Sequence, residues 1–283
     1  MPIGHVTRAT VEEYRRLRLQ EDRYRGKPLT PATVNRDVAF LKTVFQRAFV
    51  WEFLDRNPLQ GMEMLPERNK RDVDLKPEQI VALANELTET MGKIVLFAVY
   101  AGFREENILG LRIEDVQIFD LRSSTADPAG KVNLVVKGGA QESFPLGEAA
   151  VDILQSVIDD RAEGYVFVNA RTGSRYRDVG KPFRVAVRRL GLTVRQDGKR
   201  VSLRFHDLRH VYATWLHARG ISLDVIGNLM GHKTLKTTDR YTTYDRIAAG
   251  KALSLLPLPR HCHTEGQPRR STVSEVQVVS SGR

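Results

Sequence analysis

The chain has 283 residues and a mass of 32.0 kDa, and its 41% hydrophobic and 28% charged residues are typical of a folded protein with two domains. An excess of 44 Lys and Arg over 34 Asp and Glu gives a net charge of +10, which makes a polyanion the first partner to consider. The longest apolar stretch, residues 94–103, is shorter than the roughly 20 residues of a membrane span, and the single Cys262 excludes an internal disulfide and a cysteine-based metal site. We therefore expect a cytoplasmic protein without a signal peptide and without a membrane partner.

Residues 1–66 are predicted to form a small helical module. Its first helix is expected over residues 7–22, because Thr10 and Glu13 have the spacing of a capping box. Two helices bury little surface by themselves, so the module cannot hold a large core. A charged segment without apolar periodicity, residues 67–74, is expected to link it to the next domain.

The second helix of this module has the clearer pattern. Thr30 can cap it and Pro31 suits its first turn, and the helix is expected to end near residues 57–58. Its apolar residues recur at helical spacing, at Val34, Val38, Leu41, Phe45, Ala48 and Phe49.

Residues 75–258 are predicted to form a larger, mostly helical domain with a small antiparallel sheet, which makes the fold class mainly α with a small sheet (α+β). Strands are expected over residues 132–136 and 142–146, joined as a hairpin, and over residues 165–168. Helices are expected over residues 77–89, 91–103, 182–190, 206–219, 222–230 and 234–246. Residues 259–283 are polar and aperiodic and are expected to form a flexible tail.

Two separate cations are candidates for binding a phosphate. Arg104 follows a glycine and precedes a helix, and a guanidinium held at such a junction suits bidentate phosphate binding; the alternative is a surface arginine paired with Glu105 or Glu106. Lys137 lies at the turn of the predicted hairpin, where a lysine with a lowered pKa can give up a proton. The alternative for Lys137 is a solvated turn lysine.

The segment H-D-L-R-H puts His206, Arg209 and His210 on one face of a predicted helix. Three cationic groups on one face repel each other, and an anion between them would relieve that repulsion. Two histidines at this spacing also suggest a zinc hydrolase. Asp207 is shorter than the glutamate of that motif, however, and the sequence offers no third ligand nearby.

A histidine and a tyrosine near the end of the predicted domain complete the candidates. His232 follows a predicted helix end, and Tyr241 comes nine residues later on the next predicted helix. A tyrosine can act as a covalent nucleophile when cations surround its target. Tyr244, one helical turn further, is the competing nucleophile, and simple packing is the alternative for the His–Tyr pair.

Four motifs occur in the order G-F-R-E-E-N-I-L-G-L, the hairpin lysine, H-D-L-R-H, and L-M-G-H followed by Y-T-T-Y. In this order they resemble the tyrosine recombinase (phage integrase) family over residues 73–250. Residues 30–48 have a weaker likeness to the core-type DNA-binding module of that family. The resemblance implies a two-domain architecture, a helical DNA-binding module followed by a catalytic domain.

The resemblance also implies how a DNA strand is bound. Arg104 and Arg209 would hold the scissile phosphate, and His232 would donate a further hydrogen bond to it. The partner would be double-stranded DNA, gripped by a homotetramer that joins two duplexes in a synapse. The +4 charge of residues 1–70 and the +4 charge of residues 71–259 suit two domains on one duplex, although plain solubility would explain them equally well.

The chemistry that the resemblance implies is strand cleavage and rejoining by a site-specific DNA recombinase. Tyr241 would attack phosphorus to give a 3′-phosphotyrosyl link, with His206 as general base and Lys137 as general acid on the leaving 5′ oxygen. The family spacing from the preceding histidine selects Tyr241 over Tyr244. Because the covalent link keeps the bond energy, no metal and no cofactor is expected.

The sequence departs from the family pattern at two places. Asn107 stands where the family commonly has an acid, with Glu106 one residue earlier, and the module before residue 66 is expected to lack the first helix of the family version. A DNA-binding relative with weak or no catalytic activity is therefore the alternative function, and a zinc hydrolase that uses His206 and His210 is a remote one.

Overall fold

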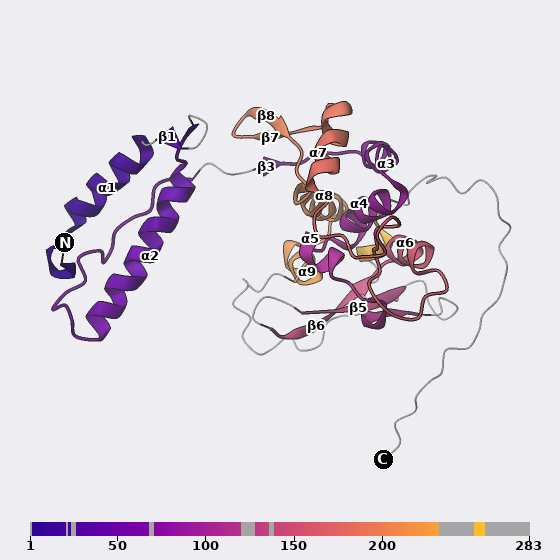
Figure 1. Ribbon diagram of the computed structural model, residues 1–283, viewed down its shortest axis with the longest axis horizontal. Helices are drawn as coiled ribbons and strands as arrows, with labels where there is room; N and C mark the ends of the chain where they lie inside the picture. Colours follow the sequence, from indigo (N-terminus) through magenta and orange to yellow (C-terminus); the bar gives the residue numbers. More distant parts are fainter. Residues whose placement is uncertain are drawn as a thin grey trace, which may run out of the picture. The chain divides into compact units, whose positions relative to one another are not determined.

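The computed structural model describes residues 2–20, 22–23, 27–67, 71–119, 128–135, 139–231 and 252–257. The chain divides into two compact units, Met1–Lys70 and Arg71–Arg283 (Figure 1). The predicted fold class, mainly α with small antiparallel sheets, is confirmed, although the second unit has two three-stranded sheets where the sequence predicted one. Among the described residues, every helix is too short or too polar to span a bilayer.

The first unit is built from two helices that pack against each other, α1 (Arg8–Gln20) and α2 (Pro31–Val50). A 3-10 turn, η1 (Ile3–His5), precedes α1, and a short antiparallel pair, β1 (Asp22–Arg23) and β2 (Lys27–Pro28), connects the helices. The segment after α2 covers the helices and completes the core. This core consists of Val11, Leu29, Val34, Val38, Phe45, Leu59 and Met62.

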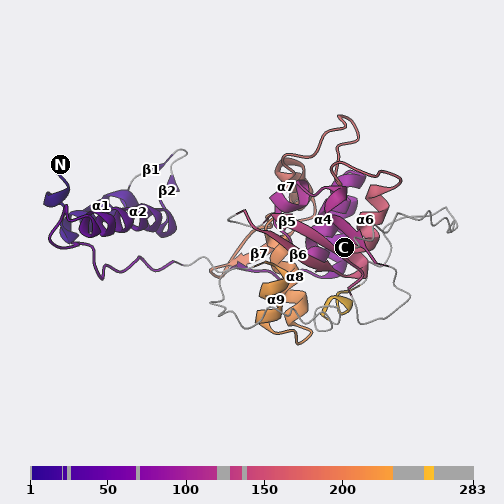
Figure 2. The same ribbon diagram turned by 90° about the horizontal axis from the view of Figure 1, so that it is seen from below.

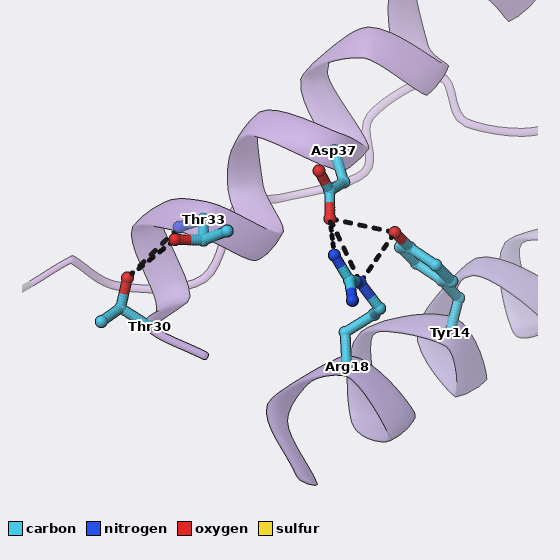
Figure 3. Close-up of polar contacts among 5 residues, drawn as sticks. All are labelled: Tyr14, Arg18, Thr30, Thr33 and Asp37. Atoms are coloured by element: carbon cyan, nitrogen blue, oxygen red, sulfur yellow. Dashed lines mark hydrogen bonds and ion pairs between the residues drawn. The ribbon is translucent and has the colours of Figure 1, made fainter. Parts of the chain in front are cut away.

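Side-chain caps fix the starts of both helices. The Thr30 hydroxyl accepts a hydrogen bond from the Thr33 backbone N–H at 3.4 Å, as its predicted capping role requires (Figure 3). The capping box predicted at Thr10 is wrong in position, because Thr7 and Thr10 exchange backbone-to-hydroxyl hydrogen bonds of 3.3 and 3.2 Å. Helix α1 therefore begins one turn earlier than that box implied, and Glu13 pairs with Arg16 instead.

Helix α2 ends earlier than the sequence predicted, at Val50 and not near residues 57–58. Glu52 has a φ of 60°, which reverses the chain direction. The apolar residues around this end are exposed, Trp51 by 61% and Phe53 by 73%, so no buried stripe supports a further helical turn.

A polar cluster joins the two helices of the first unit. The Tyr14 hydroxyl donates to Oδ2 of Asp37 at 3.0 Å, and Arg18 donates to the same oxygen through Nη2 at 3.1 Å (Figure 3). Burial, followed by the hydrogen bond to Asp37, raises the pKa of Tyr14. The cluster fixes how α1 lies against α2.

The second unit combines helices with two antiparallel sheets. Its helices are α3 (Pro77–Asn85), α4 (Glu89–Ala101), α5 (Glu105–Leu109), η2 (Ile113–Asp115), α6 (Glu148–Ile158), α7 (Gly180–Arg189), α8 (Asp207–His217) and α9 (Leu223–Leu229). One sheet has the order β4-β5-β6, with β4 (Val116–Ile118), β5 (Gly130–Val135) and β6 (Gln141–Leu146). The other has the order β3-β7-β8, with β3 (Arg71–Asp72), β7 (Thr193–Gln196) and β8 (Lys199–Ser202).

Helix α4 is the centre of this unit. It packs against α3, α6 and α8, and both views show it between α6 and α8 (Figure 1 and Figure 2). Every residue from Ile94 to Ala101 is buried, which explains the longest apolar stretch of the sequence as a core helix. The helix ends at Ala101, two residues before the predicted end, and the residue that follows, Gly102, has a left-handed φ of 67°.

Two other expectations differ from the structure. The strand predicted over residues 165–168 is reduced to isolated bridges, Arg112 with Tyr165 and Val168 with Arg175. Arg71 and Asp72, predicted to lie in a linker, form β3 and pair with β7, in a sheet that the sequence did not predict. The helix predicted over residues 234–246 lies outside the described residues.

Candidate active site

Arg209 lies in the interior of the second unit, near the start of α8, and is only 4% exposed. Its Nη1 donates to the carbonyl oxygen of Gly102 at 2.7 Å, and its Nη2 donates to that of Met230 at 2.6 Å. Burial, followed by the charge of Arg104, lowers the pKa of Arg209 to about 10, so the group stays protonated at neutral pH. A buried cation that is held by carbonyls and has no carboxylate partner among the described residues is suited to binding an anion.

Arg104 approaches the same place from another element. It is the N-cap residue of α5, directly after the glycine turn that ends α4, and it is half-buried. The predicted alternative, pairing with Glu105 or Glu106, is not observed in this described part of the chain, where the Arg104 guanidinium has no ion pair. Its charge lowers the pKa of both Arg209 and His206, so the three groups lie within electrostatic reach of one another.

His206 adds a titratable group beside the two arginines. It immediately precedes α8, and its ring stands at 88° to the ring of His210, with centroids 5.6 Å apart. Partial burial is the main cause of the lowered pKa of His206, followed by the neighbouring His210 and Arg209. Arg104 adds to the decrease, and the carboxylate of Asp207 opposes it. A neutral imidazole with a lowered pKa can accept a proton at neutral pH.

The zinc alternative also concerns His206 and His210. Asp207, the acid between them, is 2% exposed and forms an ion pair with Arg71 at 2.7 Å, so its carboxylate is already used. Among the described residues, no three His, Cys, Asp or Glu side chains gather into a group that could hold a metal ion. The arrangement of this face therefore favours an anion over a cation.

A cavity of about 730 Å³ opens over these residues. It is lined by Arg104, Glu105, Glu106, Leu109, Arg175, Tyr176, Arg177 and His206. The structure thus brings together two of the predicted site residues, Arg104 and His206, at one cavity, and it couples both to the buried Arg209.

Sequence reasoning missed Arg175 and Arg177, which come from the loop between the Val168 bridge and α7. Arg175 stacks over the ring of Tyr165, with the guanidinium carbon 5.2 Å from the ring centroid. Arg177 is exposed. The signal that could have found them is the basic run R-T-G-S-R-Y-R, but only the fold shows that this loop reaches the cavity.

The acids of the cavity wall lie on α5. Burial, followed by the charges of Asp178 and Glu106, raises the pKa of Glu105, whereas a hydrogen bond from the Val179 backbone opposes this increase. Asn107 is half-buried on the same short helix. Negative charge near the site therefore comes from positions 105 and 106, next to the asparagine.

Lys137, His232 and Tyr241 lie outside the described residues. Met230 and Gly231, which precede His232 in the sequence, are described and contact Arg209 and β6, respectively. Met230, two positions before His232, accepts the hydrogen bond from Arg209. Gly231 packs so closely on Phe144 of β6 that an added Cβ would be 2.9 Å from the ring, and β6 is the second strand of the hairpin whose turn contains Lys137.

Gly102 accepts a hydrogen bond from Arg209 through its carbonyl, and its backbone conformation and close packing both require a glycine at this position. Its φ is 67°, and an added Cβ would lie 2.5 Å from the ring of Tyr212. We expect Gly102→Ala to lower the free energy of unfolding by about 2 kcal/mol or more, because a left-handed conformation and a clash are combined. Thermal unfolding measures this loss.

Gly220→Ala is the matched control for that substitution. Gly220 has a φ of 83° but nothing within 4 Å of an added Cβ, so the control carries the conformational cost alone. The expected loss for Gly220→Ala is about 1 kcal/mol. Equal losses for the two variants would contradict a clash with Tyr212.

The sequence profile of the phage integrase family matches residues 74–246. The chain belongs to the phage integrase family. This confirms the predicted tyrosine recombinase resemblance, and the match contains all six predicted site residues, from Arg104 to Tyr241. The chain is 25% identical to the integrase of Salmonella phage P22 over 232 residues, which is 77% of this chain and 55% of that protein. It is 27% identical to tyrosine recombinase XerC of Pelobacter propionicus over 231 residues, which is 78% of this chain and 72% of the relative.

Solved structures of similar fold agree with this family. A Tn1549 transposon integrase in complex with transposon right end DNA has a TM-score of 0.62 at 18% identity. The match covers 90% of this chain and 82% of the transposon integrase chain. A lambda integrase dimer bound to a COC′ core site has a TM-score of 0.59 at 18% identity, and the match covers 86% of this chain and 85% of the lambda integrase chain. A lambda integrase tetramer bound to a Holliday junction has a TM-score of 0.60 at 17% identity. At these identities the likeness establishes the fold.

Proposed function

We propose that this protein is a site-specific DNA recombinase, which cleaves and rejoins DNA strands through a 3′-phosphotyrosyl intermediate at Tyr241. The observation that carries the proposal is the buried Arg209, a cation that is held by two carbonyls and lies within electrostatic reach of Arg104 and His206, two of the residues that line the cavity. In a member of the phage integrase family, the anion that suits this site is a phosphate of the DNA backbone.

Arg104 and Arg209 bind the scissile phosphate and neutralise the charge that grows on its non-bridging oxygens in the transition state. His232 donates a further hydrogen bond to one of these oxygens. The carbonyls of Gly102 and Met230 hold the Arg209 guanidinium in a fixed orientation before the DNA arrives. Such preorganisation lowers the cost of stabilising the transition state, because the donors do not reorganise during the reaction.

The phenolic oxygen of Tyr241 attacks phosphorus and forms the new P–O bond, while the bond from phosphorus to the 5′ oxygen breaks. His206 takes the phenolic proton, and Lys137 gives a proton to the leaving 5′ oxygen, so the products are a 3′-phosphotyrosyl strand and a 5′-hydroxyl. A 5′-hydroxyl of the partner strand then attacks the phosphotyrosine and releases Tyr241. The phosphodiester energy is conserved, and the reaction proceeds without a metal or a cofactor.

The substrate is double-stranded DNA, which is bound by both units of the chain, Met1–Lys70 and Arg71–Arg283. Four copies of the chain hold two duplexes in a synapse, and the lambda integrase tetramer on a Holliday junction supports this assembly by analogy. The protein acts in the cytoplasm and is associated with the nucleoid when it is bound to DNA.

Covalent trapping tests the proposed function. A nicked suicide duplex, built on the repeats that flank the encoding gene, loses its short 5′-hydroxyl fragment after cleavage and leaves the protein attached. We expect an adduct that resists denaturant and that nuclease treatment reduces to a tyrosine-linked nucleotide. Specific binding of the duplex without any adduct would favour the inactive relative and overturn the proposal.

DNA affinity should fall steeply with salt, because phosphate contacts release counterions. With six or more contacts, the affinity is expected to fall by about a thousandfold between roughly 50 and 200 mM salt. Arg177→Ala should weaken binding for all sequences and reduce the slope by about one, because Arg177 lines the cavity. Arg171→Ala, on the same loop but outside the cavity lining, is the control for gel-shift titrations. Equal effects of both variants, or binding insensitive to salt, would contradict this prediction.

A further inference from the structure

An ion pair of the second unit lies directly beneath the candidate active site. Nε and Nη2 of Arg71 donate to the two carboxylate oxygens of Asp207 at 2.9 and 2.7 Å. The side chains are 10% and 2% exposed, so both charges are almost fully removed from water. Such a bidentate pair fixes orientation as well as distance, because the planar guanidinium matches the carboxylate at two points.

The rest of the Arg71 guanidinium is bonded to the neighbouring sheet. Nη1 donates to Oε1 of Gln196 at 2.7 Å, and Nη2 also donates to the carbonyl oxygen of Ser202 at 2.9 Å. Arg71 itself lies in β3, opposite Gln196 of β7. The side chain therefore joins the sheet β3-β7-β8 to the start of α8.

Asp207 connects Arg71 to the backbone of the turn before α8 through its hydrogen bonds. Its Oδ2 accepts a hydrogen bond from the Arg204 backbone N–H at 2.7 Å, and its own N–H donates to the Arg204 carbonyl oxygen at 2.9 Å. These two bonds close the turn that carries His206. Arg209, two residues after Asp207, lies in the first turn of α8.

We propose that Arg71 is a positioning residue for strand cleavage, which acts through Asp207 to hold His206 and Arg209 at the scissile phosphate. The inference rests on the proposed function, since it assigns a role in that reaction. Every nitrogen of the Arg71 guanidinium and both carboxylate oxygens of Asp207 form hydrogen bonds within the protein, so we assign neither side chain to the DNA phosphate. Two buried charges are costly to retain if they only stabilise the fold, because well-packed apolar residues serve that purpose at least equally well.

Several charged groups face His206, and changes to the Arg71–Asp207 ion pair should therefore alter the pH dependence of cleavage. These groups are Asp207, Arg209 and His210 of α8, Arg104 from the start of α5, and the cavity residues Glu105, Glu106, Arg175 and Arg177. Asp207 is the neighbour that raises the pKa of His206, and Arg71 compensates part of its charge. As general base His206 must be neutral, so the cleavage rate rises with pH through its pKa.

Single-turnover cleavage of the nicked duplex tests the inference with Arg71→Ala, Arg71→Lys and Asp207→Asn. We expect each variant to cleave about 100-fold more slowly, because small displacements of reacting groups cost this much. DNA affinity should stay within about threefold of wild type, since no phosphate contact is removed. The matched control is Arg189→Ala, which removes an exposed arginine–carboxylate pair of the same unit, Arg189 with Glu86 at 2.9 Å, and should cleave at the wild-type rate.

The pH profile separates positioning from simple destabilisation. In Arg71→Ala the uncompensated Asp207 should move the acidic limb of the rate profile to higher pH. In Asp207→Asn the loss of the carboxylate should move it to lower pH. A merely structural role would give shifts of the same sign or none, and either of those results, or wild-type cleavage by Arg71→Ala, would overturn the inference.

Two further measurements keep the outcome interpretable. If Arg71→Ala does not fold, Arg71→Lys keeps the charge but loses the bidentate geometry, and it should still show the slow cleavage. If the wild-type protein forms no adduct, the proposed function fails, and NMR titration of His206 then tests the ion pair directly. Opposite shifts of the His206 pKa in Arg71→Ala and Asp207→Asn would support the positioning role, and unchanged values would overturn it.

Discussion

Tyr241→Phe is expected to lose the covalent protein–DNA adduct completely, whereas Tyr244→Phe keeps it. The substitution removes one oxygen atom, and that oxygen forms the bond to phosphorus, so no neighbouring group can replace it. A fall of more than about 10⁴-fold in single-turnover cleavage, to below detection, is the expected magnitude. Denaturing gels of the nicked duplex with each variant measure the adduct directly.

The two tyrosines are matched controls for each other. They lie three positions apart in the sequence, and each substitution keeps the aromatic ring, so packing changes little. Tyr241→Phe should bind the duplex with wild-type affinity, which shows that loss of adduct is a loss of chemistry. Adducts with Tyr241→Phe but none with Tyr244→Phe would reverse the assignment of the nucleophile.

The local parts of the site were predictable because short-range geometry determines them. Helical spacing predicts that His206 and Arg209 share one helix; Arg209 lies in α8, which begins at Asp207, and His206 is the N-cap residue directly before it. The apolar residues of that helix also have helical spacing, and all of them are buried, namely Leu208, Val211, Tyr212, Trp215 and Leu216. Gly102 could also have been recognised as a helix end, since a glycine after an apolar helix is the usual left-handed cap.

The contacts between distant segments were not predictable from patterns. Arg71 meets Asp207 across 136 positions of the chain, and two-residue strands such as β3 have no periodicity to detect. Asp207 was considered only as an argument against zinc, although its carboxylate holds the turn beneath His206. Arg175 and Arg177 were missed for the same reason, because only the path of their loop brings them to the cavity.

The end of α2 illustrates the opposite error, in which local pattern was followed too far. Apolar residues continue past Phe49, but Val50, Trp51 and Phe53 are 64%, 61% and 73% exposed. Hydrophobic composition alone could not reveal that these side chains leave the core. A helix continues only while packing supports its turns, so it stops where that support ends.

Arg209→Lys is expected to slow strand cleavage by about 10³-fold while leaving DNA affinity within a few-fold of wild type. A lysine can keep one hydrogen bond to the carbonyls of Gly102 and Met230, but it cannot span both and still present donors to the phosphate. The loss therefore concerns the transition state, where charge on the phosphate oxygens grows, more than ground-state binding.

Arg219→Lys is the control for this change. Arg219 follows the same helix and donates through Nη1 to the carbonyl oxygen of Trp215 at 2.9 Å, so it also is an arginine held by the backbone. Arg219 is exposed, however, whereas Arg209 is buried within electrostatic reach of Arg104. Cleavage by this control should equal wild type. Because Arg209→Lys leaves one of the two buried carbonyl acceptors without its hydrogen bond, it should also lower the free energy of unfolding by about 1–3 kcal/mol, much less than is needed to unfold the protein. A large loss of stability in Arg209→Lys, with cleavage reduced only in proportion to the folded fraction, would show that Arg209 serves the core and not the phosphate.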